Sequence, residues 1–96
     1  MVSTPYRENA KVEKNMCVSQ MARKIEEVYY KRLNSSNVAV CMKFRRYYTM
    51  PDGHGRYEYE YSARLMYEDR SLTLVTSKDG FEEALIELAN QLEVAL

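Results

Sequence analysis

The spacing of apolar side chains changes twice along the 96-residue chain. Between about Val12 and Leu33 apolar residues recur every three or four positions, which places them on one stripe of a helix. These positions are Val18, Met21, Ala22, Ile25, Val28, Tyr29 and Leu33. Asn34 follows the stripe and can adopt the left-handed conformation that ends many helices. The pattern predicts a helix over about residues 12–33.

From Val38 the period becomes two, which is typical of a half-buried strand. The alternation stops at Pro51-Asp52-Gly53-His54-Gly55 and resumes from Tyr57 to Tyr67. Asp-Gly between two alternating runs indicates a hairpin, because glycine tolerates the positive φ that tight turns need. With Asp52-Gly53 as the loop, the apolar residues of both strands share one face. The expected pairs are Val38–Tyr67, Val40–Leu65, Met42–Ala63, Phe44–Tyr61 and Arg45–Glu60. A longer loop of the same parity keeps the same faces.

A second turn at Asp69-Arg70 is expected to return residues 71–77 along the sheet. The pairs would be Tyr67–Leu72, Leu65–Leu74 and Ala63–Thr76. Asp79 and Glu82 have the spacing of a capping box before a final amphipathic helix. We therefore expect an α+β fold of order α-β-β-β-α: a three-stranded antiparallel meander with both helices packed on one face. Residues 12–96 form the single domain, and residues 1–11 are a polar N-terminal arm.

The composition fits a folded domain rather than a disordered or membrane-spanning chain. Apolar residues make up 46% and charged residues 29%, with three glycines and two prolines. No apolar run approaches the roughly 18–20 residues of a membrane helix, and the N-terminus has no signal-peptide core. We expect a cytoplasmic protein without membrane contact.

The residues needed for common catalytic chemistries are scarce. His54 is the single histidine and falls in a glycine-flanked turn, where an orienting partner is rare. Cys17 and Cys41 are 24 positions apart and do not have zinc-site spacing; we expect both as buried, reduced thiols. No glycine-rich phosphate loop is present. The sequence predicts no enzyme, no metal and no cofactor.

Charge is balanced overall but uneven along the chain. Residues 1–57 contain 11 basic and 5 acidic side chains, whereas residues 58–96 contain 3 and 9. The two halves could neutralise one another when packed, or the first half could present a basic binding surface.

The distal part of the hairpin combines arginine and tyrosine on both strands. Both residue types are enriched at binding hot spots, and interleaved basic and aromatic groups also suit single-stranded nucleic acid. We predict a partner-binding site here, unless the tyrosines fill the sheet core, as is expected for Tyr61. The predicted site residues are Arg45, Arg46, Tyr47, Tyr48, Arg56, Tyr57 and Tyr59.

The final helix carries a second candidate interface beside its apolar stripe. Its residues are Glu82, Glu83, Ile86 and Glu87, with Val94 beyond them. A homodimer contact is the interpretation considered for this surface.

The segment from Ile25 to Leu96 resembles the bacterial ribosome hibernation factors. The resemblance lies in a helix, a hairpin, a further strand and a final helix introduced by Lys78-Asp79-Gly80-Phe81-Glu82-Glu83-Ala84-Leu85. It implies the α-β-β-β-α fold and, by family function, ribosomal RNA binding. Double-stranded-RNA-binding domains share much of this pattern. Two features differ: residues 1–11 are a poor match to the family's first strand, and the final helix has no Lys or Arg after Lys78.

Two functional hypotheses follow. The first is a non-catalytic module that binds and regulates or inhibits a protein or ribonucleoprotein, as an accessory or inhibitor protein of the phage type would. The second is an RNA- or ribosome-binding protein similar to hibernation factors. The second hypothesis would use Lys11, Lys14, Arg23, Lys24, Arg45, Arg46 and Arg56.

Overall fold

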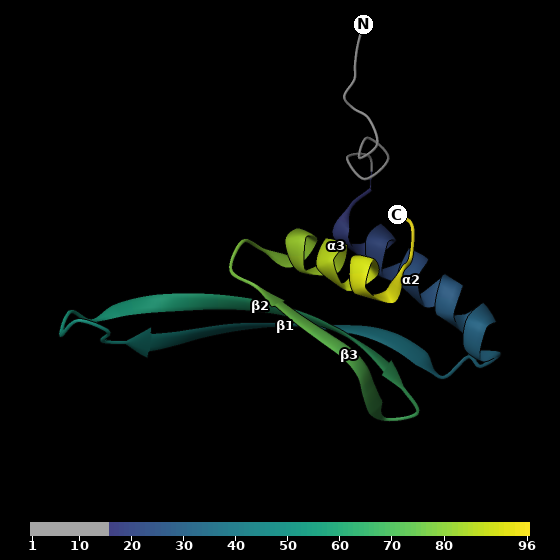
Figure 1. Cartoon of the computed structure of the whole chain (residues 1–96), viewed down its shortest axis with the longest axis horizontal. Helices are drawn as coiled ribbons and strands as arrows, with labels where there is room; N and C mark the ends of the chain where they lie inside the picture. Colours follow the sequence, from purple (N-terminus) through teal and green to yellow (C-terminus); the bar gives the residue numbers. More distant parts are fainter. Residues whose placement is uncertain (1–15) are drawn as a thin grey trace, which may run out of the picture.

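The computed structural model describes residues 16–96 and contains two helices and a three-stranded sheet in that part of the chain. The elements are α2 (Val18–Leu33), β1 (Val38–Thr49), β2 (Arg56–Tyr67), β3 (Arg70–Ser77) and α3 (Phe81–Leu92). The strands form an antiparallel meander in the order β1-β2-β3. Both helices lie on the same face of the sheet (Figure 1). The predicted fold is thus confirmed. The predicted arm, and the residues before Met16 that the first helix was expected to include, lie outside the described residues.

The β1–β2 register is the one predicted from the alternation. Val38 pairs with Tyr67, Phe44 with Tyr61, and the ladder continues to Thr49 and Arg56. The loop is therefore residues 50–55 rather than Asp52-Gly53 alone, and its parity is unchanged. Because the register is the same, Val38, Val40, Ala63 and Leu65 all face the helices.

The predicted β2–β3 register is wrong by two residues at the turn and by one residue beyond it. Glu68 and Asp69 form the turn, both with positive φ as in a type I′ connection, so Tyr67 lies opposite Arg70 and not Leu72. A bulge between Leu65 and Met66 then shifts the pairing by one residue, which places Val75 rather than Leu74 opposite Ala63, where Thr76 was expected. Leu72 and Leu74 are consequently 44% and 56% exposed.

Small side chains at the helix–sheet contact account for this choice of register. Ala63, Ala84 and Ala89 are almost fully buried and Val75 is 5% exposed. These small residues let α3 approach the sheet closely, and a leucine at the place of Val75 would overfill that space.

The end of α2 is set by local backbone conformation, whereas the end of α3 is held by a side chain of α2. Asn34 ends α2 in the predicted left-handed conformation, with φ 50°. At the end of α3, the Arg32 guanidinium donates to the backbone oxygens of Leu92 and Glu93 at 3.0 and 3.1 Å. A cation at a helix C-terminus satisfies its unpaired carbonyls and complements its dipole. At the other end the prediction was wrong: the N-cap of α3 is Gly80, not Asp79, and no side chain caps it.

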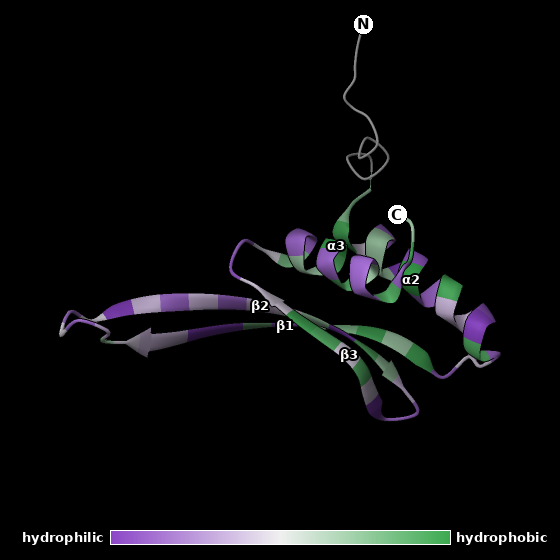
Figure 2. Cartoon of the chain, viewed as in Figure 1, coloured by the Kyte–Doolittle hydropathy of each residue, from purple (hydrophilic) through white to green (hydrophobic). Residues whose placement is uncertain are grey.

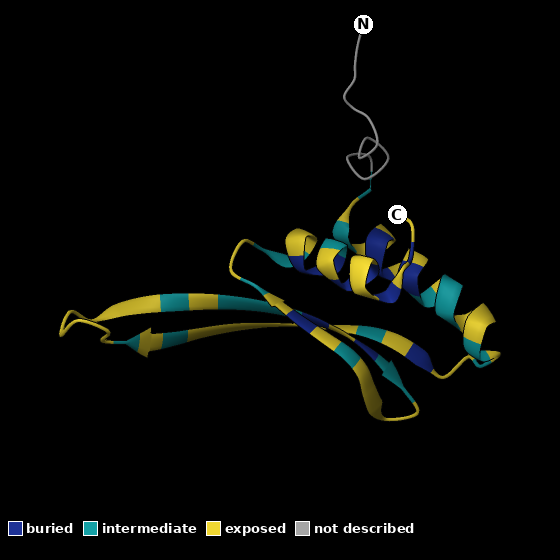
Figure 3. Cartoon of the chain, in the orientation of Figure 1, coloured by how far each residue is buried: buried dark blue, intermediate teal, exposed yellow. Residues whose placement is uncertain are grey.

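The core lies between the two helices and the half of the sheet beneath them (Figure 3). Its largest fully buried side chains are Met21, Ile25, Leu65, Leu85 and Leu88. Figure 2 shows the apolar positions of the strands gathered in the same half.

The burial of three residues differs from what the sequence predicted. Val94 is 6% exposed and belongs to the core, so it is not available for a dimer contact. Cys17 and Cys41 are free but exposed, not buried. Cys17 precedes the first turn of α2, and Cys41 lies on the sheet face that no helix of the described chain covers.

Candidate partner-binding hairpin

The distal hairpin, residues 43–60, extends beyond both helices (Figure 1). The lengths of the elements explain why. Each of the two strands has 12 residues and spans about 40 Å. The helices have 16 and 12 residues and span only about 24 and 18 Å. The helices therefore cannot cover the whole hairpin.

On the face that continues the core, which we call the aromatic face, the distal hairpin carries exposed rings. Its members are Phe44, Arg46, Tyr48, Tyr57 and Tyr59, which the register places side by side. The four rings are 44–58% exposed. An exposed apolar surface of this kind is unusual on a small domain and marks interaction sites.

The rings form two groups of contacts, one that begins at the core and one near the tip of the hairpin. Phe81 at the start of α3 contacts Tyr61, and Tyr61 contacts Phe44, each at a centroid distance of 5.1 Å. Tyr48 and Tyr57 meet edge to face at 5.3 Å, and the Arg46 guanidinium lies 4.7 Å from the Tyr57 centroid. These contacts fall in the favourable range for aromatic pairs and for cation–π pairs, so they order the aromatic face without burying it.

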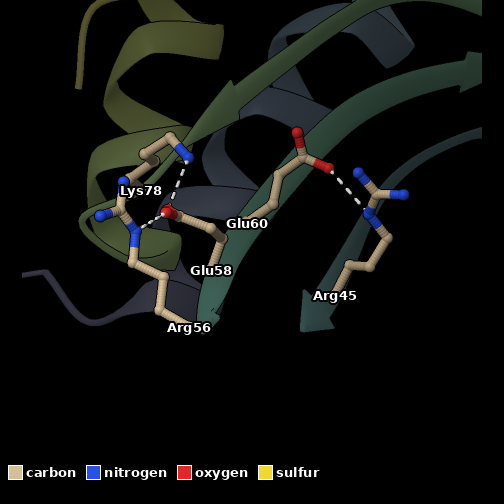
Figure 4. Close-up of polar contacts among 5 residues, drawn as sticks. All are labelled: Arg45, Arg56, Glu58, Glu60 and Lys78. Atoms are coloured by element: carbon tan, nitrogen blue, oxygen red, sulfur yellow. Dashed lines mark hydrogen bonds and ion pairs between the residues drawn. The ribbon is translucent and has the colours of Figure 1, made fainter. Parts of the chain in front are cut away.

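The opposite face of the distal hairpin is polar, and we call it the charged face. Arg45 pairs with Glu60 at 3.2 Å, and Glu58 accepts from Arg56 at 2.7 Å and from Lys78 at 3.4 Å (Figure 4). Tyr47 lies under the Arg45 guanidinium, 4.4 Å from ring centroid to carbon. Hydrogen bonds from Arg56 and then Lys78 hold the pKa of Glu58 below its ordinary value, and the bond to Glu58 raises the pKa of Lys78.

The seven residues predicted from the sequence thus divide between two faces. Arg46, Tyr48, Tyr57 and Tyr59 lie on the aromatic face, whereas Arg45, Tyr47 and Arg56 lie on the charged face. A flat partner surface laid on one face of the hairpin would contact only one of the two sets, because side chains alternate across a strand.

Sequence reasoning missed two members of the exposed surface. Phe44 and the neighbouring Met42 were expected on the shared apolar face and were not included in the site, but they are 48% and 39% exposed. Comparing strand length with helix length would have found them, since both lie near the limit of helix coverage.

The second candidate interface is only partly available. Glu82, Glu83 and Glu87 are exposed on α3, whereas Ile86 is half-buried against the core. Glu83, Glu87 and Gln91 line a shallow groove with the outer edge of β3. Within residues 16–96 none of these glutamates forms an ion pair, so the uneven charge of the two chain halves is neutralised mainly at the hairpin.

The cationic residues of the RNA hypothesis are not assembled on one surface. Arg45 and Arg56 are paired with glutamates, and Arg23 and Lys24 lie on the outside of α2. Lys11 and Lys14 lie outside the described residues. Phosphate neutralisation dominates nucleic-acid affinity, and the pairing of Arg45 and Arg56 with glutamates reduces the positive charge that the hairpin offers to a phosphate.

Residues 16–96 contain no cluster of three or more His, Cys, Asp or Glu side chains able to hold a metal ion. None of the helices in that range is long and apolar enough to span a membrane. Comparisons of the chain with protein-family models, curated proteins and solved structures give no match. The case for a function therefore depends on the geometry of the hairpin.

Proposed function

We propose that this protein is a non-catalytic binding module that captures a protein partner on the aromatic face of its distal hairpin. The observation that carries the proposal is the exposure of Phe44, Tyr48, Tyr57 and Tyr59 on a face that the helices do not reach. Ring contacts and the β1–β2 ladder fix these side chains in advance, so little conformational entropy is lost on binding. A partner that buried them would gain the large contact area for which tyrosine is favoured at hot spots.

Such a module would regulate or inhibit its partner by occupying a surface, as an accessory or inhibitor protein of the phage type does. No catalytic group is needed for that role. The small size of the domain suits it as well, because a hairpin that extends beyond its core can enter a groove that a compact body could not.

Affinity capture from a native host lysate, with and without nuclease, tests the proposal. The variant Phe44→Ser/Tyr48→Ser/Tyr59→Ser should lose the captured protein, since each buried aromatic hot spot contributes about 2 kcal/mol or more, or about 30-fold in affinity. A matched control is Tyr30→Ser, which removes a 39% exposed tyrosine of α2 far from the hairpin. Capture by the triple variant equal to that of the wild type would refute the role of the aromatic face.

The nuclease arm separates the alternative, RNA or ribosome binding. Stacked tyrosines beside Arg46 are compatible with base stacking. In that case capture would disappear after nuclease treatment, and affinity would fall steeply with salt as counterions are released. We expect instead that the complex survives nuclease.

A further inference from the structure

In the part of the chain that the structure describes, the outer edge of β1 has no neighbouring strand over the distal hairpin, and one hydrogen bond shows which backbone groups of β1 face this edge. The backbone N–H of Val40 donates to the Glu26 carboxylate of α2 at 2.8 Å, so the backbone N–H and C=O of Val40 face away from β2. In an antiparallel pair, residues along a strand point alternately toward the neighbour and away from it. Met42, Phe44, Arg46 and Tyr48 therefore direct their backbone N–H and C=O groups to the open edge.

Within residues 16–96 nothing occupies this part of the edge. β1 is the first strand of the sheet order, and β2 is its only neighbour. Glu26 occupies the edge at Val40, where α2 passes, and the strand then continues without a helix beside it (Figure 1). The edge from Met42 to Tyr48 is thus a template of unpaired donors and acceptors at two-residue intervals.

The side chains of β1 specify what kind of strand would fit beside it. On the aromatic face its next neighbours would be Met42, Phe44, Arg46 and Tyr48, of which three are apolar or aromatic and favour apolar side chains. On the charged face they would be Lys43 and Arg45. Lys43 forms no ion pair within residues 16–96, and Arg45 contacts Glu60 through Nε but remains 56% exposed, so both favour carboxylates. β1 contains three cationic residues and no acidic one. A complementary strand has apolar and acidic residues in alternation.

A second copy of this chain fits the edge poorly. If two copies of β1 paired antiparallel with Phe44 opposite Phe44, Lys43 of each copy would lie directly opposite Arg45 of the other, and like charges directly opposite destabilise a sheet. Cations on an edge protect against self-association, but protection alone does not explain why Phe44 is 48% exposed there. The combination of charge and exposed ring favours a foreign, acidic strand.

We propose that the β1 edge from Met42 to Tyr48 accepts an extended acidic segment of the partner protein as a fourth strand of the sheet. The segment alternates apolar residues, which lie on the aromatic face, with Asp or Glu, which lie beside Lys43 and Arg45. This inference rests on the proposed function and names the chemistry of the partner segment. Backbone hydrogen bonds supply affinity, and the alternating side chains supply specificity.

Amide exchange measured by NMR on the full ¹⁵N-labelled chain tests the proposal directly. The probe is a ten-residue peptide of alternating valine and glutamate, and the matched control alternates valine and lysine. At saturation the glutamate peptide should slow exchange at Met42, Phe44, Arg46 and Tyr48 at least tenfold. Lys43, Arg45 and Tyr47 should not change, because their amides already face β2. Equal protection by the lysine peptide, or no protection at these four amides, would overturn the proposal.

A proline variant removes one outward donor and leaves the β1–β2 ladder intact. Arg46→Pro should weaken peptide binding at least tenfold relative to Arg46→Ala, which loses the same charge but retains the amide. Unchanged chemical shifts of the β2 residues in Arg46→Pro would verify that the β1–β2 hairpin keeps its structure. If the hairpin of this variant is disturbed, a peptide N-methylated at alternate residues on its pairing edge gives the same test on the unmodified protein. Undiminished binding of that peptide contradicts strand addition.

The same measurements distinguish this inference from the proposed function. If Phe44→Ser/Tyr48→Ser/Tyr59→Ser abolishes partner capture while Arg46→Pro and Arg46→Ala capture equally, the aromatic face binds the partner and the edge does not. Concentration-dependent dimerisation that protects the four amides without peptide would identify a second copy as the occupant and overturn the proposal. Protection by a uridine oligonucleotide but not by the glutamate peptide would overturn it in favour of RNA.

Discussion

The two halves of the β1–β2 hairpin have one continuous backbone ladder but opposite surroundings. In the proximal half, Val38, Ala63 and Leu65 are buried beneath the helices. In the distal half the same face continues as Phe44, Tyr48 and Tyr57, which remain about half exposed. The comparison teaches that alternation determines which face a residue lies on, whereas burial depends on how far the covering helices reach. One half serves stability and the other is available for binding.

The largest difference between the halves should appear when a large side chain is removed from each. Leu85→Ala leaves a cavity under the helices and should cost about 2–5 kcal/mol in the free energy of unfolding. Tyr48→Ala, on the aromatic face, should cost below about 1 kcal/mol, because its ring loses only a cross-strand pair. Urea denaturation checks both values. Similar losses would mean that the distal hairpin is part of the core in solution.

A smaller effect tests the bulged register of β3. Val75→Ala should destabilise the protein by about 2 kcal/mol, because Val75 lies in the core. Leu74→Ala should change stability by no more than about 0.5 kcal/mol, because Leu74 is exposed. Thermal or urea unfolding of the two variants measures both changes in stability. The reverse order would restore the unbulged register expected from the sequence.

The stability of the β1 edge at Val40 should depend on the hydrogen bond that Glu26 accepts there. Glu26→Ala leaves the half-buried Val40 N–H without its acceptor and should cost about 1 kcal/mol. Its neighbour Glu27 is exposed and provides the control, with an expected change within about 0.5 kcal/mol for Glu27→Ala. Faster amide exchange at Val40 in the first variant alone would accompany the loss. If both variants behave alike, the helix does not hold this edge.

The smallest effect concerns the charged face. Arg56 and Lys78 lower the pKa of Glu58, so the ion pair stabilises the fold above the ordinary glutamate value of about 4.3 and is lost as pH falls through the lower folded value. An NMR titration should show Glu58 ionising below the ordinary glutamate value, and Arg56→Gln should move its midpoint upward. A midpoint that is the same in the wild type and in Arg56→Gln would show that the Arg56–Glu58 pair in Figure 4 does not persist in solution.

Particular residues show how far prediction from sequence extended. The pairing of Phe44 with Tyr61 followed from alternation and from one Asp-Gly loop, because a slip of one residue would have moved every apolar side chain to water. The partner of Ala63 on β3 could not be found in this way. A bulge adds one residue and reverses the faces, and the preference for Val75 over Leu74 depends on how closely α3 packs.

The sequence placed the candidate site on the hairpin but did not divide it between the two faces. Composition drew attention to arginine and tyrosine, and alternation already implied that Arg45 and Arg46 point in opposite directions. The partners of Arg45 and Arg56, by contrast, depend on rotamers and on Lys78, which is brought in by the turn after β3. Phe44 escaped notice because nothing in a single strand indicates where a helix ends.

The order of elements, the two amphipathic helices and the β1–β2 register are contained in the sequence, because each follows from periodicity and local turn chemistry. Tertiary structure alone decided which aromatic residues stay exposed, which arginines are neutralised and which leucines leave the core. Those outcomes arise from packing between elements distant in sequence, where the reach of a helix and the volume beneath it determine what is buried.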